Sequence, residues 1–181
     1  MATHGVSGGV VASLALVNDL GGRRIGLIEP FYTYHIFQIE RVFGKSAEIV
    51  YLPLKAPSEN YAPNWELLER EIPTLNLIIC CNPSNPTGKV WTRDELRRLV
   101  SLTKQHKCKL LLDECYSDMI WQPHEFYTPF QDSIEDHVIA VRGFSKVLGA
   151  QSWRSGYVIS TAETIQQLMR TADPLYICVP W

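Results

Sequence analysis

The apolar run Leu75-Asn-Leu-Ile-Ile-Cys-Cys81 leads without a break into the turn Asn82-Pro-Ser-Asn-Pro-Thr-Gly88. The run lacks polar alternation, which is typical of a strand buried on both faces of a parallel sheet. A second apolar run, residues 109–113, ends at Asp113 and is followed by Glu114-Cys115-Tyr116. These two stretches predict neighbouring parallel strands whose carboxyl ends carry polar side chains.

Short apolar runs alternate with helical patterns along the rest of the chain. Further strands are expected at residues 24–29, 47–52, 138–142 and 154–160, and helices at 6–20, 31–44 and 93–106. Thr92 and Glu95 have the spacing of a capping box at the start of the last helix, and Ser160 with Glu163 predicts another helix start. The alternation predicts an α/β fold, a three-layer αβα arrangement with a mostly parallel sheet.

Composition excludes several classes of protein. The chain has 181 residues, 46% hydrophobic and 20% charged, with a formal net charge of -2. These values suit one globular domain and offer no electrostatic case for nucleic acid or a membrane surface. The apolar runs are too short to span a bilayer, and no secretory signal is visible. We therefore expect a cytoplasmic protein, or an organellar one if an N-terminal address has been lost.

The five cysteines predict neither disulfides nor a metal centre. They are Cys80, Cys81, Cys108, Cys115 and Cys178, with no CxxC pair among them. Most lie in apolar runs, which favours reduced core thiols. Because no paired Cys or His spacing is present, the sequence predicts no metal site.

The distinctive polar residues all follow predicted strands. Asn85 follows the first run, Asp113 ends the second, and Lys146 comes shortly after residues 138–142. Ligands of open parallel sheets bind in the crevice at the carboxyl ends of the strands. Each residue alone has an ordinary explanation, such as a solvated lysine, an aspartate cap or an Asn-Pro turn. Their joint placement on successive strand ends favours a common site.

The chain resembles the class I/II aminotransferases, which are fold-type-I, pyridoxal-phosphate-dependent enzymes. The matching segments are Asn82-Pro-Ser-Asn-Pro-Thr-Gly88, Asp113-Glu-Cys-Tyr116 and Gly143-Phe-Ser-Lys-Val-Leu-Gly-Ala-Gln-Ser-Trp-Arg-Ser-Gly156, with weaker matches at Thr3-His-Gly-Val-Ser-Gly-Gly9 and Glu29-Pro-Phe-Tyr32. They cover nearly the whole chain in the family's order. The resemblance implies the large cofactor-binding domain of an enzyme that moves an amino group between an amino acid and a 2-oxo acid.

The resemblance also implies a role for each polar residue near the cofactor, pyridoxal 5'-phosphate. Lys146 would be the catalytic residue: it would bond to the cofactor aldehyde and then move a proton between the substrate α-carbon and the cofactor. Asp113 would pair with the pyridine nitrogen. Asn85 and Tyr116 would donate hydrogen bonds to the phenolate oxygen.

The cofactor phosphate would be held at the start of the first helix. Gly5, Val6 and Ser7 would offer backbone N–H groups, the helix dipole and a hydroxyl. Arg154 would add a charged clamp. Gly143 stands where the family usually has a serine that binds the phosphate, and Ser145 would partly replace it.

The resemblance further predicts a stacking aromatic and two cis prolines. Tyr32 would stack on the cofactor ring; the alternative is a core aromatic, since Tyr34 and Phe37 lie nearby. The bonds before Pro30 and Pro86 are expected to be cis, against a base rate of about 5–6% for X-Pro bonds.

Family members are about twice this length and dimeric. We therefore expect residues 1–181 to be a single partial large domain without the C-terminal small domain, which carries the arginine that binds the substrate carboxylate. A homodimer is the implied assembly. The residues leave two alternatives open: a pyridoxal-phosphate lyase or synthase, of the carbon–sulfur lyase or aminocyclopropane-carboxylate synthase type, or an inactive truncated module. A dinucleotide site at residues 5–9 is rejected, because the segment is not GxGxxG and no strand precedes it.

Overall fold

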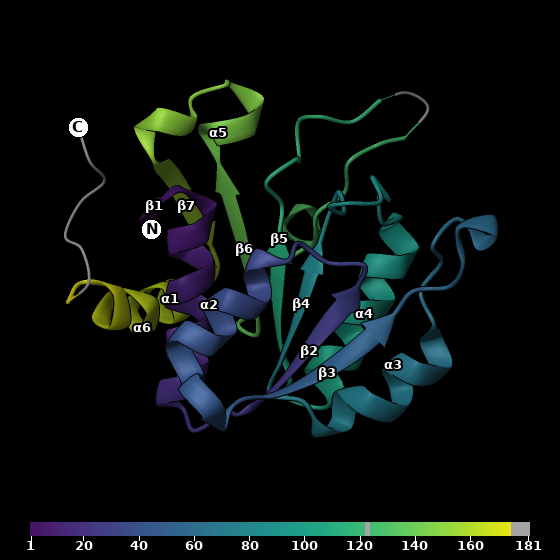
Figure 1. Cartoon of the computed structure of the whole chain (residues 1–181), viewed down its shortest axis with the longest axis horizontal. Coiled ribbons are helices and arrows are strands. Elements are labelled where there is room, and N and C mark those ends of the chain that lie inside the picture. The colour runs from purple at the N-terminus through teal and green to yellow at the C-terminus, as the bar shows by residue number, and fades with distance from the viewer. Residues whose placement is uncertain (122–123, 175–181) are drawn as a thin grey trace.

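A computed structural model describes residues 1–121 and 124–174, and its core is a seven-stranded sheet between two layers of helices (Figure 1). The strands are β1 (Ala2–His4), β2 (Arg24–Glu29), β3 (Glu48–Pro53), β4 (Leu77–Cys81), β5 (Lys109–Asp113), β6 (Val138–Gly143) and β7 (Ser155–Ile159). Their spatial order is β1-β7-β6-β5-β4-β2-β3. From β3 to β6 the neighbouring strands are parallel, whereas β7 runs antiparallel to both of its neighbours, β6 and β1. The predicted α/β class and mostly parallel sheet are confirmed.

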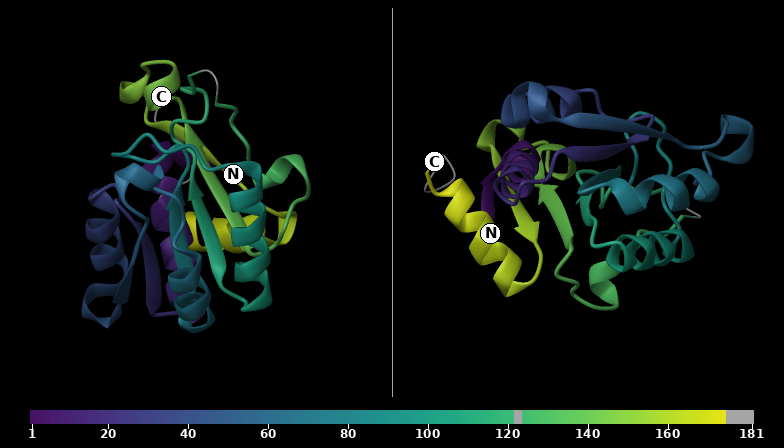
Figure 2. Two further views of the ribbon diagram at one scale, coloured as in Figure 1. Left: turned by 90° about the vertical axis from the view of Figure 1, so that its right-hand side faces the viewer. Right: turned by 90° about the horizontal axis from the view of Figure 1, so that it is seen from below.

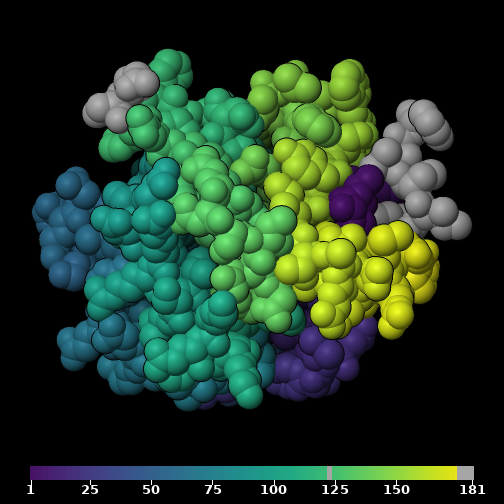
Figure 3. All heavy atoms as spheres, turned by 180° about the vertical axis from the view of Figure 1, so that it is seen from behind, coloured from purple at the N-terminus to yellow at the C-terminus, as the bar shows by residue number. Residues whose placement is uncertain are grey.

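The helices cover both faces of this sheet. They are α1 (Gly5–Asp19), α2 (Tyr34–Phe43), α3 (Trp65–Glu71), α4 (Arg93–Gln105), α5 (Phe144–Val147) and α6 (Ala162–Ala172), and short 3-10 turns are η1 (Gly44–Ser46), η2 (Pro57–Glu59), η3 (Ile72–Thr74), η4 (Pro129–Gln131) and η5 (Gln151–Trp153). Seen from below in Figure 2, α2 lies on one side of the sheet and α3 and α4 lie on the other. In the view of Figure 3, α6 packs beside the N-terminal residues.

Strand alternation sends side chains into two separate cores. On β5, Leu111 points into the core shared with α1 and α2, whereas Leu110 and Leu112 point into the core beneath α3 and α4. Asp113 therefore belongs to the α1–α2 face and Glu114 to the opposite face, because side chains alternate along a strand. This alternation decides which polar residues meet.

Helices α1 and α4 differ in how much of their surface is buried. Helix α4 is amphipathic, buries Leu96 and Leu99, and begins with the predicted Thr92–Glu95 capping box. Helix α1 buries residues all round, as a helix does when other elements surround it. It contacts α2, α6, β6 and β7, so its first turn is held firmly at the carboxyl edge of the sheet.

Several boundaries differ from the sequence-based expectation. Strand β1 and helix α3 were not expected; α3 is a short helix capped by the Asn64 side chain, and β1 has only three residues. The last helix begins after Thr161, whose side chain accepts from the Thr164 N–H, so the predicted start at Ser160 is wrong. The Ser160 hydroxyl instead donates to the carbonyl of Val138.

Three further expectations can be compared with the structure. The Glu29–Pro30 and Asn85–Pro86 bonds are cis, as predicted, and Asn82–Pro83 is cis as well. The four cysteines within the described ranges, Cys80, Cys81, Cys108 and Cys115, are free thiols; Cys178 lies outside those ranges. None of the described helices is long and apolar enough to cross a membrane.

Candidate functional site

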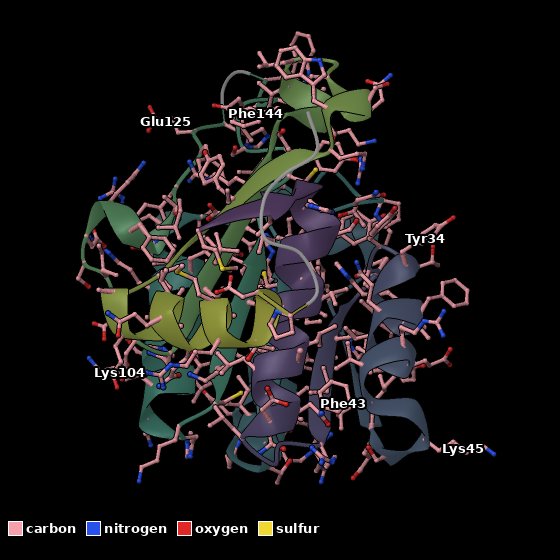
Figure 4. The ribbon with its side chains drawn as sticks, turned by 90° about the vertical axis from the view of Figure 1, so that its left-hand side faces the viewer. Tyr34, Phe43, Lys45, Lys104, Glu125 and Phe144 are labelled. Carbon is pink, nitrogen blue, oxygen red and sulfur yellow. The ribbon has the colours of Figure 1, made fainter. Side chains whose placement is uncertain are left out.

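The carboxyl ends of β4, β5 and β6 meet the first turn of α1 around one cavity of about 270 Å³. It is lined by Val6, Ser7, Val10, Tyr32, His35, Gln38, Cys81, Pro83, Asn85, Asp113, Cys115, Tyr116, Ser145, Lys146, Gln151 and Arg154. The cavity therefore brings together nine of the ten predicted site residues; Gly5, which directly precedes Val6, is not among its lining residues. Figure 4 shows Phe144 and Tyr34 at this end of the molecule, whereas Phe43 and Lys45 lie at the other.

A basic, amide-rich corner occupies one end of the cavity. Helix α1 starts at Gly5 with no acidic residue in its first turn and no side-chain cap hydrogen bond from His4. A Cβ atom at Gly5 would come within 3.0 Å of the Arg154 guanidinium, and Gly5 has φ +62°, so only glycine fits there. Arg154 itself lies in the left-handed region at φ 49° and is tied to the Gln151 carbonyl. The helix N-terminus and the guanidinium together form an anion-binding corner.

A buried carboxyl group lies at the end of β5. Asp113 is 7% exposed; its Oδ1 accepts from the Cys115 N–H at 3.0 Å, and its Oδ2 lies 3.5 Å from His35 Nε2. Burial raises the pKa of Asp113, and His35 and the Cys115 N–H oppose that shift. Within the described ranges no lysine or arginine pairs with this carboxyl group.

An amine, a phenol and an amide surround the middle of the cavity. The exposed side chain of Lys146, on α5, makes no hydrogen bond or ion pair with any described residue. Asn85 Nδ2 donates to the Tyr116 hydroxyl at 3.5 Å. Burial is the main cause of the raised pKa of Tyr116, so its phenol keeps its proton as a donor. The sequence-based expectation that Lys146 and Asp113 share one site agrees with this geometry.

Tyr32 lies between the cavity and a surface aromatic group. It stacks on Tyr34 at 5.3 Å between ring centroids and meets His35 edge-on at 5.6 Å. Tyr32 is partly exposed and lines the cavity, so it is not an ordinary core aromatic.

The sequence analysis missed two cavity residues, His35 and Cys81. His35 is 1% exposed and its backbone N–H donates to the Tyr32 carbonyl just before α2, and its Nδ1 contacts Gln38 Oε1 at 3.0 Å. Cys81 Sγ lies 3.5 Å from His35 Nε2. Burial, and then Asp113, raises the pKa of the Cys81 thiol well above its ordinary value. Strand alternation was a usable signal, because Cys81 shares a face with Ile79 and pairs in register with Asp113.

Comparison with known proteins accounts for this arrangement. The sequence model of the family described as "Aminotransferase class I and II" matches residues 2–180. The chain belongs to this aminotransferase family. An aspartate aminotransferase of Sulfurisphaera tokodaii is 31% identical over 171 residues, which are 93% of this chain and 41% of that protein.

A second relative and a solved structure extend the comparison. Cystathionine beta-lyase PatB of Bacillus subtilis is 31% identical over 135 residues, 72% of this chain and 34% of that protein. A Thermus thermophilus aspartate aminotransferase double mutant shares the fold with a TM-score of 0.86 and 22% identity, covering 99% of this chain and 46% of that one. The chain thus spans about two fifths of the length of the curated aminotransferases it matches.

Proposed function

We propose that residues 1–181 form the cofactor-binding large domain of an aminotransferase and that the cavity binds pyridoxal 5'-phosphate. The observation that carries this proposal is the shared cavity of Lys146, Asp113 and the Arg154 corner. An anion-binding corner, a primary amine and a buried carboxyl group suit the phosphate, aldehyde and pyridine nitrogen of that cofactor. Family membership supports the reaction, transfer of an amino group between an amino acid and a 2-oxo acid. A 27% identical solved structure from Clostridium difficile 630 is PLP-bound.

The basic corner would hold the phosphate. Backbone N–H groups of Val6 and Ser7, the Ser7 hydroxyl and the Arg154 guanidinium are its donors, and Gly5 leaves the guanidinium room to approach. Gly143 offers no hydroxyl here, and a Cβ atom at this position would lie 3.0 Å from Val6 Cγ2. Ser145, which also lines the cavity, is the substitute donor. Loss of one hydrogen bond to a charged acceptor costs about 1.5–3 kcal/mol, so Ser145 matters for affinity.

The remaining cavity residues would tune and use the bound ring. When bound, pyridoxal phosphate supplies an aldehyde that joins primary amines and a ring that accepts electrons from the substrate α-carbon. Asp113 would hold the proton on the pyridine nitrogen, while Asn85 and Tyr116 would donate hydrogen bonds to the ring oxygen. Tyr32 would pack against the ring face. Lys146 would supply the primary amine that joins the cofactor aldehyde and would act as the base that moves the proton at the substrate α-carbon.

Reconstitution of the cofactor-free chain tests this proposal. Pyridoxal phosphate added to the parent chain should give a protein-bound visible absorption band, and borohydride should fix one cofactor per chain on the peptide that contains Lys146. Lys146→Ala should abolish this covalent attachment completely. Lys104→Ala, at an exposed lysine paired with Glu135 far from the cavity, is the matched control and should behave as the parent. Attachment at other lysines, or persistence in Lys146→Ala, would refute the proposal.

A carbon–sulfur lyase is the second candidate function. Its support is the 31% identity to cystathionine beta-lyase PatB, equal to that of the first aminotransferase relative. The same cofactor residues serve both reactions, so the cavity does not separate them. A full-length enzyme that contains this chain separates them: release of pyruvate from a cysteine conjugate without any added 2-oxo acid favours the lyase.

Assembly and location are also proposals. We propose a homodimer in the complete enzyme; exposed apolar side chains near the cavity, Phe144, Leu148 and Trp153, support a contact surface on α5 and η5. The four free thiols support a reducing, cytoplasmic compartment. Sedimentation of the reconstituted full-length enzyme tests the dimer.

A further inference from the structure

Three side chains in the cavity have the identity and spacing of metal ligands. His35 Nε2 lies 3.5 Å from Asp113 Oδ2 and 3.5 Å from Cys81 Sγ, and one ligand atom from each residue lies within 4.8 Å of the others. Tetrahedral zinc with bonds of about 2.1 Å to N and O and about 2.3 Å to S separates neighbouring ligand atoms by about 3.4–3.6 Å. Two of the three separations already match. The third separation, between Cys81 Sγ and Asp113, is at most 4.8 Å.

The surroundings orient these atoms before any ion arrives. Gln38 Oε1 contacts His35 Nδ1 at 3.0 Å; with the proton on Nδ1, the Nε2 lone pair faces Cys81 and Asp113. The Cys115 N–H holds Asp113 Oδ1, which turns Oδ2 toward the histidine. Such outer partners are what fixes ligands at protein metal sites.

The charge balance of this cluster also favours a cation. His35 is 1% and Asp113 7% exposed, and among the described residues His35 is the only basic group that pairs with the carboxyl group. A bound metal ion would place a positive charge between the His35 nitrogen and the Asp113 carboxyl group, and a buried carboxylate is unfavourable without such a partner. All three residues line the cavity, so the fourth tetrahedral position opens into it, as in sites that keep one exchangeable ligand.

We infer that His35, Cys81 and Asp113 form a zinc site in the cofactor-free chain, and that zinc and pyridoxal phosphate exclude each other. The exclusion rests on the proposed function, because Asp113 is the residue proposed to pair with the pyridine nitrogen. The zinc site itself does not depend on the proposed function. The sequence predicted no metal centre because its ligands come from α2, β4 and β5, which linear spacing does not bring together.

Metal titration of the cofactor-free chain tests the site. Calorimetry should show one zinc ion per chain, and cobalt(II) should give a thiolate-to-metal charge-transfer band. Cys81→Ser should remove that band and weaken zinc binding at least about 100-fold, and Gln38→Ala should weaken it about 10–100-fold. Cys115→Ser, at the other cavity thiol, is the matched control and should keep both signals. A cobalt band that survives in Cys81→Ser, or no band in the folded parent, overturns the inference.

A second group of candidate metal ligands provides a control for where zinc binds. Glu135, Asp136 and His137 also place ligand atoms within 4.8 Å, at the opposite end of β6, but Lys104 already pairs with Glu135 at 2.7 Å. His137→Gln should leave zinc binding unchanged. If His137→Gln abolishes binding while Cys81→Ser does not, the ion is bound at the second cluster and the inference is wrong.

Competition tests the exclusion. Zinc-loaded chain should give no protein-bound cofactor band until a chelator is added, and cofactor-loaded chain should not take up zinc. Simultaneous binding of both overturns the exclusion. If the metal-free chain binds no pyridoxal phosphate, both the exclusion and the proposed function are wrong. The zinc site is tested separately, by the cobalt band.

Discussion

Asp113 and Glu114 are consecutive buried carboxyl groups that serve two different regions of the molecule. Asp113 points into the cavity on the α1–α2 side, where its Oδ1 accepts from the Cys115 N–H and, among the described residues, His35 at 3.5 Å is its one basic partner. Glu114, 0% exposed, points to the opposite face, where Arg142 Nε donates to its Oε2 at 2.8 Å. Arg142 also lies over the Phe126 ring. One carboxyl group has a full counter-charge and the other does not.

The difference in charged partners favours different roles for the two carboxyl groups. Burial raises the pKa of both groups, but Arg142 opposes the shift at Glu114 with a fixed positive charge, whereas at Asp113 the opposing group is a histidine. A buried carboxylate with a permanent partner crosslinks β5 to β6. A buried carboxylate without one is held ready for a positive charge that a ligand brings. The Glu114 pair therefore suits support of the fold, and the environment of Asp113 suits the proposed binding of a positively charged group.

The largest effect expected from this comparison is on stability, at the Glu114 region. Arg142→Met leaves Glu114 charged and buried without a partner, which should lower the free energy of unfolding by about 3–5 kcal/mol. Urea unfolding of the cofactor-free chain measures it. The double variant Glu114→Leu with Arg142→Met removes both charges and should recover most of the loss. A single variant within about 1 kcal/mol of the parent would show that the pair does not support the fold.

The next effect is on binding, at the Asp113 region. Asp113→Asn keeps the shape but removes the charge, so pyridoxal phosphate should bind about 10–100-fold more weakly, as expected for one hydrogen bond between charged groups. Because burial disfavours the ionised carboxyl group at neutral pH, the same variant should unfold with an unchanged or higher free energy. Absorbance titration and urea unfolding measure the two quantities.

Glu114→Gln is the matched control for that variant, since it makes the same chemical change one residue away. It should lower the free energy of unfolding and leave the cofactor affinity within about threefold, because Glu114 faces away from the cavity. If the two variants have the same effects on binding and on stability, the distinction between the regions is lost.

The sequence predicted those features of the two regions that depend on local pattern, namely strand positions and the polar residues at strand ends. Apolar runs located β2 and β5 with both boundaries correct, and strand ends located Asp113, Asn85 and Lys146 at one edge. Roles for these residues came from family motifs. The partners His35 and Arg142 were not predicted, because each lies dozens of residues away from the carboxyl group it contacts and only the sheet order brings them together. Strand β1 was missed because three residues carry too little pattern.

An exposed carboxyl group completes the comparison and gives the smallest effect. Asp132 Oδ2 accepts from Arg97 Nε at 2.7 Å and from the Tyr127 hydroxyl at 2.5 Å. The hydrogen bond from Arg97, followed by that from Tyr127, lowers the pKa of Asp132 to about 2. Pairing at the surface thus shifts the pKa in the direction opposite to burial at Asp113 and Glu114.

The sign of the pH dependence follows from that shift. Because the folded-state pKa lies below the unfolded value of 3.8, the native chain binds fewer protons and Asp132 stabilises the fold above about pH 4. This contribution is lost as the pH falls from about 4 through 2. The difference in unfolding free energy between the parent and Asp132→Asn should therefore be constant near neutral pH and shrink over that window. Arg97→Gln removes the main cause and should move the loss to higher pH, whereas a difference that stays constant down to pH 2 would show that the carboxylate charge does not contribute.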